Sequence, residues 1–300
     1  MPSTYLQPTE YAAYGVPSAA AADVLQASMI IDSYLDRNEG LVWAPDSQGM
    51  PCDMAAVVPS MSLTLGAAIT PGQNVVVPFA GPIGALQVGD VAVLDRATQG
   101  SKEACVIAAV AGAQVTLVSV INPHSSGATA DLGLAIEEQK YMPSARPLTF
   151  LSRTPIVRIL SGIGRYAYGR RGDATNYMVE EFNLLASISH FGGPPAWERF
   201  DPLITDYNAS AGQVWIPAGL LMAYFSEVRI RYLAGYAQAN LPSQIKQACA
   251  NIVAALQASP LRGNMKSMKA GDSAIERFGP SIMDAETKAM LDSFRSRSFI

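Results

Sequence analysis

The pattern of hydrophobic and polar positions is clearest over Val228–Gln257, where a period of two gives way to a helical period. Val228, Ile230 and Tyr232 alternate with Arg229, Arg231 and Leu233, as in a half-buried strand. Gly235 ends the alternation, and Ser243 after Pro242 is a good helix N-cap. The apolar residues that then recur at helical spacing are Ile245, Ala248, Cys249, Ile252, Ala255 and Leu256. The pattern predicts a strand–helix unit over residues 228–258.

A second amphipathic helix is predicted near the N-terminus, over residues 18–37, where the alanines at 19–22 favour helix. Its apolar face consists of Val24, Ala27, Ile31, Tyr34 and Leu35. A last short helix is predicted from an N-cap at Asp284, at the end of a tail that covers residues 260–300.

The pattern of apolar and turn residues in the centre of the chain predicts strands. Residues 104–110 and 114–121 flank Ala-Gly-Ala at 111–113, the pattern of a hairpin. With the turn and strand at 89–95, this pattern indicates a small β-barrel or sandwich inserted at residues 63–146. Residues 40–60 carry several prolines and are predicted to be a loop.

Two of these segments carry a family resemblance. The run from Tyr232 through Gly235, Tyr236 and Pro242 into a helix, and the helix end Ile31–Arg37 (I-D-x-Y-L-x-R), resemble head-to-tail adaptor (connector) proteins of tailed double-stranded DNA bacteriophages. They lie about two hundred residues apart, in the family's order, and together cover roughly a quarter to a third of the chain. The usual members are much shorter, and the long central β-rich region departs from them.

The resemblance implies an α+β fold, in which a helical adaptor core carries the inserted barrel or sandwich and an extended C-terminal tail. The core would comprise residues 1–62 and 147–259, the insert residues 63–146, and the docking tail residues 260–300. The family implies a structural virion protein made in the host bacterial cytoplasm. In the neck it would form a ring of about twelve copies under the portal protein. The ring would contact the next neck or tail protein and surround the passing DNA without reading its sequence.

The tail is the candidate docking segment, because a short amphipathic helix on a loose tether is a common docking device. A helix packed on its own domain fits the pattern equally well. The residues predicted to contact a partner are Met265, Met268, Arg277, Phe278, Met290, Leu291, Phe294, Arg295 and Arg297. Arg170 and Arg171 lie in a basic turn, either a solvated hairpin tip or a contact with a neighbouring subunit or DNA phosphate.

The amino-acid composition is compatible with a chain that assembles with copies of itself. Only 15% of residues are charged, against about 25% in average soluble proteins, which suggests that subunits bury surface against one another; an ordinary alanine-rich globular protein is the alternative. The net charge is −4: residues after Pro260 carry seven basic and five acidic groups (+2), which leaves −6 for the rest. A mildly acidic body would let DNA slide through a channel. The three cysteines read as free thiols, and we expect neither a signal peptide nor a membrane span.

Catalytic motifs are missing from the sequence. His124 and His190 lack metal-ligand spacing, and there is no nucleophile elbow. The glycine-rich run at 161–164 is interpreted as a turn between two strands and lacks the remaining residues of a P-loop or dinucleotide motif. We therefore expect no catalytic residue, cofactor or metal. The alternatives are another neck ring (stopper or tail terminator), a β-rich tail-associated carbohydrate-binding protein and, last, a hydrolase with two carboxylates.

Overall fold

The computed structural model describes residues 4–112, 114–142, 147–165, 197–217, 225–258, 267–270, 273–276 and 282–295, with the backbone alone at 267–270 and 273–276. The chain divides into two compact units. Leu41–Tyr236 make up the first, here called the β unit. Pro2–Gly40 and Ala237–Ser296 make up the second, the helical unit. The sequence prediction placed its boundaries differently, after residues 62, 146 and 259.

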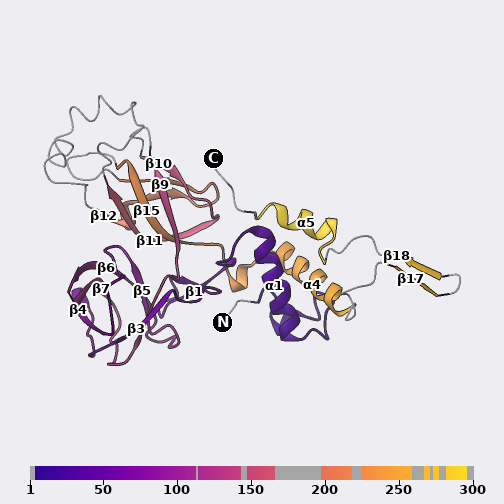
Figure 1. Ribbon diagram of the computed structural model, residues 1–300, viewed down its shortest axis with the longest axis horizontal. Coiled ribbons are helices and arrows are strands. Elements are labelled where there is room, and N and C mark those ends of the chain that lie inside the picture. The colour runs from indigo at the N-terminus through magenta and orange to yellow at the C-terminus, as the bar shows by residue number, and fades with distance from the viewer. Residues whose placement is uncertain are drawn as a thin grey trace. The chain divides into compact units, whose positions relative to one another are not determined.

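A closed barrel forms the first part of the β unit (Figure 1). Its strands, in the order β3-β4-β7-β6-β5-β8, are β3 (Met61–Leu65), β4 (Gly72–Ala80), β7 (Gln114–Val120), β6 (Glu103–Ala111), β5 (Val91–Leu94) and β8 (Thr129–Leu132). Alternate residues point inward, and Leu65, Val77, Ile107 and Leu117 are buried there. The barrel interior is therefore a packed apolar core.

A four-stranded antiparallel sheet forms the second part of the β unit. Its order is β12 (Glu198–Phe200), β11 (Ile156–Arg165), β15 (Glu227–Ala234) and β9 (Ile136–Tyr141). Val228, Ile230 and Tyr232 share a buried cluster with Val214 of a small sheet, β10 (Leu148–Phe150), β14 (Gln213–Trp215) and β13 (Asp206–Asn208). Arg229 and Arg231 occupy the other face, as the period of two requires. A third sheet contains β16 (Tyr236–Ala237), β1 (Val42–Pro45) and β2 (Pro51–Met54).

The predicted turn at residues 161–164 is wrong, because β11 runs unbroken through it. A Cβ at Gly162 would overlap the ring of Phe200, and one at Gly164 the ring of Phe225. These glycines make room for aromatic rings packed against the strand, which sequence alone does not reveal. The loop predicted at residues 40–60 is also wrong, since β1 and β2 pair there as an antiparallel hairpin.

The helical unit contains α1 (Ala21–Leu35), α4 (Ser243–Gln257) and α5 (Ala285–Asp292), with short 3₁₀ turns η1 (Pro8–Glu10) and η5 (Gln238–Asn240). A hairpin, β17 (Ser267–Ala270) and β18 (Ser273–Glu276), belongs to the same unit. The predicted strand, glycine corner and helix are confirmed as β15, Gly235 and α4. The predicted N-cap is wrong by one residue, because Pro242 occupies that position and α4 begins at Ser243.

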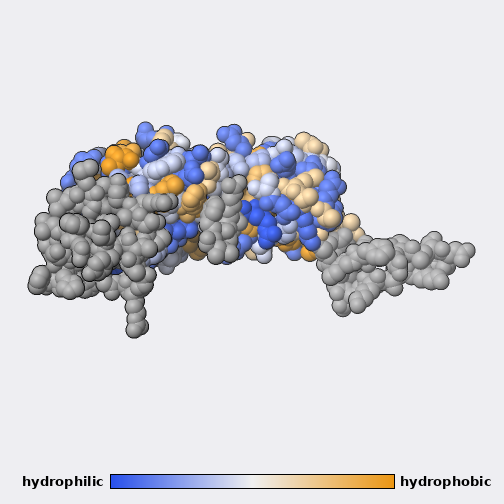
Figure 2. Space-filling view, turned by 90° about the horizontal axis from the view of Figure 1, so that it is seen from above, coloured by the Kyte–Doolittle hydropathy of each residue, from blue (hydrophilic) through white to orange (hydrophobic). Residues whose placement is uncertain are grey.

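The predicted fold class, a helical core with a β insert, is wrong: the protein is mostly β, with a closed six-stranded barrel. The alternating valine, alanine and isoleucine residues between 41 and 236 build strands, and the described α-helices all lie in the helical unit. Figure 2 shows small hydrophobic patches scattered among hydrophilic residues on the face in view. No described helix has the length and apolar character that crossing a membrane requires.

Candidate functional site

The I-D-x-Y-L-x-R motif forms the C-terminal end of α1. Ile31 and Leu35 are fully buried on one face of the helix. Asp36 follows in the left-handed conformation (φ 54°), and the cap N–H groups bond to the carbonyls of Asp32 and Ser33. The motif thus ends the helix and turns the chain, and its last residue, Arg37, is only 1% exposed.

Asp32 and Arg37 of this motif belong to a polar cluster that is largely shielded from solvent. The hydroxyl of Tyr5 donates to the carboxylate of Asp32, and Arg37 Nε lies 3.4 Å from Glu39 Oε1. Burial raises the pKa of Asp32 to about 7; nearby Glu39 acts in the same direction, whereas Tyr5 and Arg37 oppose it. These contacts hold the end of α1 against the N-terminal segment and the residues that follow the helix.

The docking residues of the C-terminal helix are partly used inside the helical unit. α5 begins as predicted after Asp284, whose carboxylate accepts the N–H of Thr287 at 2.7 Å. Leu291 is fully buried, and Met290 and Phe294 are half-buried. α5 packs against α4 and α1, which is the arrangement predicted for a helix docked on its own domain.

Arg295 is the exposed member of this set, and its guanidinium lies 5.4 Å from the ring centre of Tyr34. Met268 lies in β17, where the structure describes the backbone alone. The remaining predicted contacts lie outside the described residues: Arg170, Arg171, Met265, Arg277, Phe278 and Arg297. His190 also lies outside them.

His124 is buried beside the barrel between two carboxylates. Its Nδ1 lies 2.7 Å from Asp95 and its Nε2 lies 2.7 Å from Glu103. Glu103 also accepts the N–H groups of Ile121 and Asn122 at 2.8 and 2.9 Å. Both ring nitrogens are therefore occupied, and no group of three or more metal-ligating side chains with metal-site geometry occurs in the described parts of the chain.

The charge of His124 should make the β unit more stable at low pH. Burial lowers the pKa of His124, but the bonds to Glu103 and Asp95 outweigh it and raise the pKa above its ordinary value. A group whose pKa is raised in the folded state stabilises the fold fully at pH values below its unfolded-state pKa, about 6.5 for histidine. This stabilisation is lost as the pH rises through the folded-state pKa. We expect the free-energy difference between wild type and His124→Gln to shrink as pH rises above about 6.5.

Urea unfolding followed by tryptophan fluorescence measures this difference, because Trp43, Trp197 and Trp215 all belong to the β unit. Comparison with His124→Gln cancels the contributions of other titrating groups, Asp32 among them. A difference that stays constant between pH 6 and 9 would show that the imidazole carries no charge in the folded protein.

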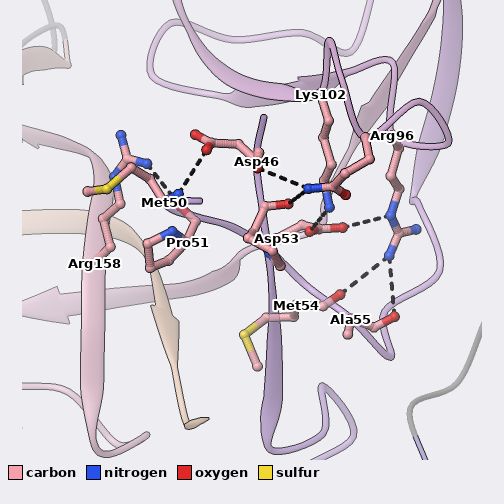
Figure 3. A network of polar contacts seen from close by, with 11 residues as sticks. Asp46, Met50, Pro51, Asp53, Met54, Ala55, Arg96, Lys102 and Arg158 are labelled. Carbon is pink, nitrogen blue, oxygen red and sulfur yellow. Dashed lines mark hydrogen bonds and ion pairs between the residues drawn. The ribbon is translucent and has the colours of Figure 1, made fainter. Parts of the chain in front are cut away.

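Asp53 is the centre of a charged network that joins β2 to the barrel (Figure 3). Lys102 Nζ lies 2.6 Å from Asp53 Oδ1, and Arg96 Nε lies 2.7 Å from Asp53 Oδ2. Arg96 also donates to the carbonyls of Met54 and Ala55. Asp53 and Lys102 are 1% and 3% exposed and Arg96 is half-buried, so one buried carboxylate pairs with two cations. Sequence reasoning missed this network, since 49 residues separate Asp53 from Lys102.

The three tryptophans have different surroundings. Trp43 packs beside the buried cluster that contains Met54 and Leu233. Trp197 lies under two guanidinium groups, with Arg165 and Arg229 at 4.7 and 4.9 Å from its ring centre. Trp215 is 38% exposed. The three residues thus differ in burial: Trp43 packs against an apolar cluster, whereas Trp215 is partly exposed.

Polar groups in the described residues thus serve packing, capping and charge pairing. None of the clusters described above pairs a nucleophile with a base beside an open cleft. Cys52, Cys105 and Cys249 are all buried free thiols, and burial raises the pKa of each. No protein-family model matches the chain, and a search of the curated proteins finds no relative.

Proposed function

We propose that the chain is a structural subunit of the connector that joins the head of a tailed bacteriophage to its tail. One observation carries the proposal. The two segments that resemble adaptor proteins are about two hundred residues apart, yet Ile31–Arg37 at the end of α1 and the helix after Pro242 belong to one compact unit. Within it, α1 and α4 pack against each other (Figure 1).

The proposed role is geometric. Copies of the chain would form a ring of about a dozen subunits beneath the portal protein, with DNA passing through the centre and the next neck or tail protein below. Because the chain is mostly β, the proposed subunit divides its role between the two units. The helical unit would carry the family-like contacts, and the β unit, inserted between residues 40 and 237, would supply additional surface.

Deleting residues 261–300, the predicted docking tail, would not test this role cleanly. It would remove α5, whose Leu291 is fully buried and whose Thr287 hydroxyl accepts a hydrogen bond from Asn251 of α4. A truncated protein could fail to assemble simply because its own core is open. A test therefore needs the full chain.

Reconstitution provides that test. Heads made by a phage that encodes this chain, but with its gene deleted, should accumulate filled and tail-less. We expect added purified protein to restore tail attachment and plaque-forming particles. His124→Gln, a substitution inside the β unit, is a matched control that should restore them as well if it folds. Tailed, infectious particles made without the protein would contradict the proposal.

A further inference from the structure

The two contacts of the His124 ring can both be made only when the ring carries two protons. Its Nδ1 lies 2.7 Å from Asp95 Oδ2, and its Nε2 lies 2.7 Å from Glu103 Oε1. Ionised carboxylate oxygens accept hydrogen bonds, whereas a neutral imidazole has one N–H donor and one acceptor nitrogen. Each ring nitrogen must therefore donate, so the ring that these carboxylates hold is the cationic imidazolium.

Asp95 and Glu103 are the charged groups of the described chain that face the His124 ring. Asp95 follows β5 directly, and Glu103 is the first residue of β6. From a third segment the backbone of Ile69, an apolar residue, pairs with that of His124 at 2.9 and 3.1 Å. The His124 side chain is 0% exposed, so water at the ring cannot replace a contact that is lost.

The two carboxylates differ in how firmly they are held. The side chain of Glu103 is 5% exposed, and it also accepts two backbone N–H groups at 2.8 and 2.9 Å. The side chain of Asp95 is 17% exposed, and besides the ring it accepts the hydroxyl of Ser101 at 3.1 Å. A carboxylate that reaches water can be hydrated when it loses a partner, whereas a carboxylate in the interior cannot. The contact with Asp95 is therefore the one that can open.

We infer that His124 is a proton-controlled latch on the loop between β5 and β6. When the ring releases one proton to solvent, the proton that remains stays on Nε2 toward Glu103, and Nδ1 changes from a donor into an acceptor. Two acceptors then face each other across the contact with Asp95, which is unfavourable. The carboxylate of Asp95 turns toward water, and the latch opens.

The loop that the latch holds also carries both cations of the Asp53 network. Arg96 and Lys102, near its two ends, pair with Asp53. Within the loop, Thr98 donates its N–H to the carbonyl of Asp95 at 2.8 Å, and Lys102 donates its N–H to the carbonyl of Thr98 at 2.9 Å. Asp95 has φ 49°, which is uncommon for a residue with a side chain. Opening of the latch should therefore loosen the turn that begins at Asp95, while the ion pairs with Asp53 keep the loop attached.

NMR of the histidine rings tests the latch in the whole protein. The chain has two histidines, so His190→Gln identifies the signals of His124. Because the bonds to both carboxylates raise the pKa of His124, the ring should hold two N–H protons at neutral pH and lose one as the pH rises through the folded-state pKa. We expect the remaining proton on Nε2. A remaining proton on Nδ1, a single proton already at neutral pH, or a ring that keeps both protons until the protein unfolds would each overturn the latch.

Amide hydrogen exchange measures the response of the loop, with protection factors that remove the direct effect of pH on exchange. When the ring loses its proton, protection of the Thr98 and Lys102 N–H groups should fall. The two N–H groups that Glu103 accepts should keep their protection. His124→Gln is the matched control, and its ratio between the two pairs should not change with pH. Equal losses at both pairs, or no loss at Thr98 and Lys102, would contradict the latch.

Discussion

Asp53→Ala is expected to lower the unfolding free energy of the β unit by about 3–5 kcal/mol. Asp53 is the single carboxylate between Lys102 and Arg96, and its removal would leave two cations without their counter-charge. Lys102 is 3% exposed and cannot recover hydration where it lies. Urea unfolding followed by tryptophan fluorescence gives the value.

Lys102→Met is the matched control, because it removes a cation and leaves Asp53 paired with Arg96 at 2.7 Å. We expect it to cost clearly less than Asp53→Ala, since an aliphatic chain of similar length fills the same space. Equal losses from the two substitutions would mean that the network acts through packing, and that charge compensation at Asp53 is unimportant.

Gly235→Ala should cost about 3 kcal/mol or more. Gly235 has φ 117°, which side chains of L-residues rarely adopt, and a Cβ there would overlap the carbonyl oxygen of Leu41. That oxygen accepts the N–H of Tyr236 at 2.8 Å, so the backbone has little room to move. The expected readout is a large fall in the urea midpoint for the β unit.

Two other glycines of the β unit distinguish the cost of the positive φ from the cost of the steric overlap. Gly49 also has positive φ (80°) but open space around it, so Gly49→Ala should show the conformational cost alone, roughly 1–2 kcal/mol. Gly100 has open space and no such φ, and Gly100→Ala should change stability by less than about 0.5 kcal/mol. If Gly235→Ala behaves like Gly49→Ala, the close approach of Leu41 is not a barrier.

Local patterns predicted the elements whose signals lie within a short stretch of chain. The spacing of apolar residues and the positions of glycine and proline predicted the strand, glycine corner and helix after Val228. The same signals predicted the hairpin of β6 and β7. Asp284 acts as the N-cap that its position suggested. In each case the residues that determine the structure are neighbours in sequence.

The failures involve residues whose role depends on distant partners. Gly162 and Gly164 looked like turn residues, and only the rings of Phe200 and Phe225 explain why a strand needs them. The balance of helix and strand could not be read from two motifs that cover a third of the chain at most. The buried pairing of His124 with Asp95 and Glu103 has no sequence signal either, because contacts across the barrel create it.

The connector role is tested most directly by the mass of the protein alone and on heads. Native mass spectrometry and sedimentation would be applied to purified protein, and then to protein mixed with filled, tail-less heads. We expect a smaller species in solution and a ring of about a dozen copies at one vertex of the head. A stable trimer, or no binding to heads, would contradict the connector role and favour a tail-associated carbohydrate-binding protein.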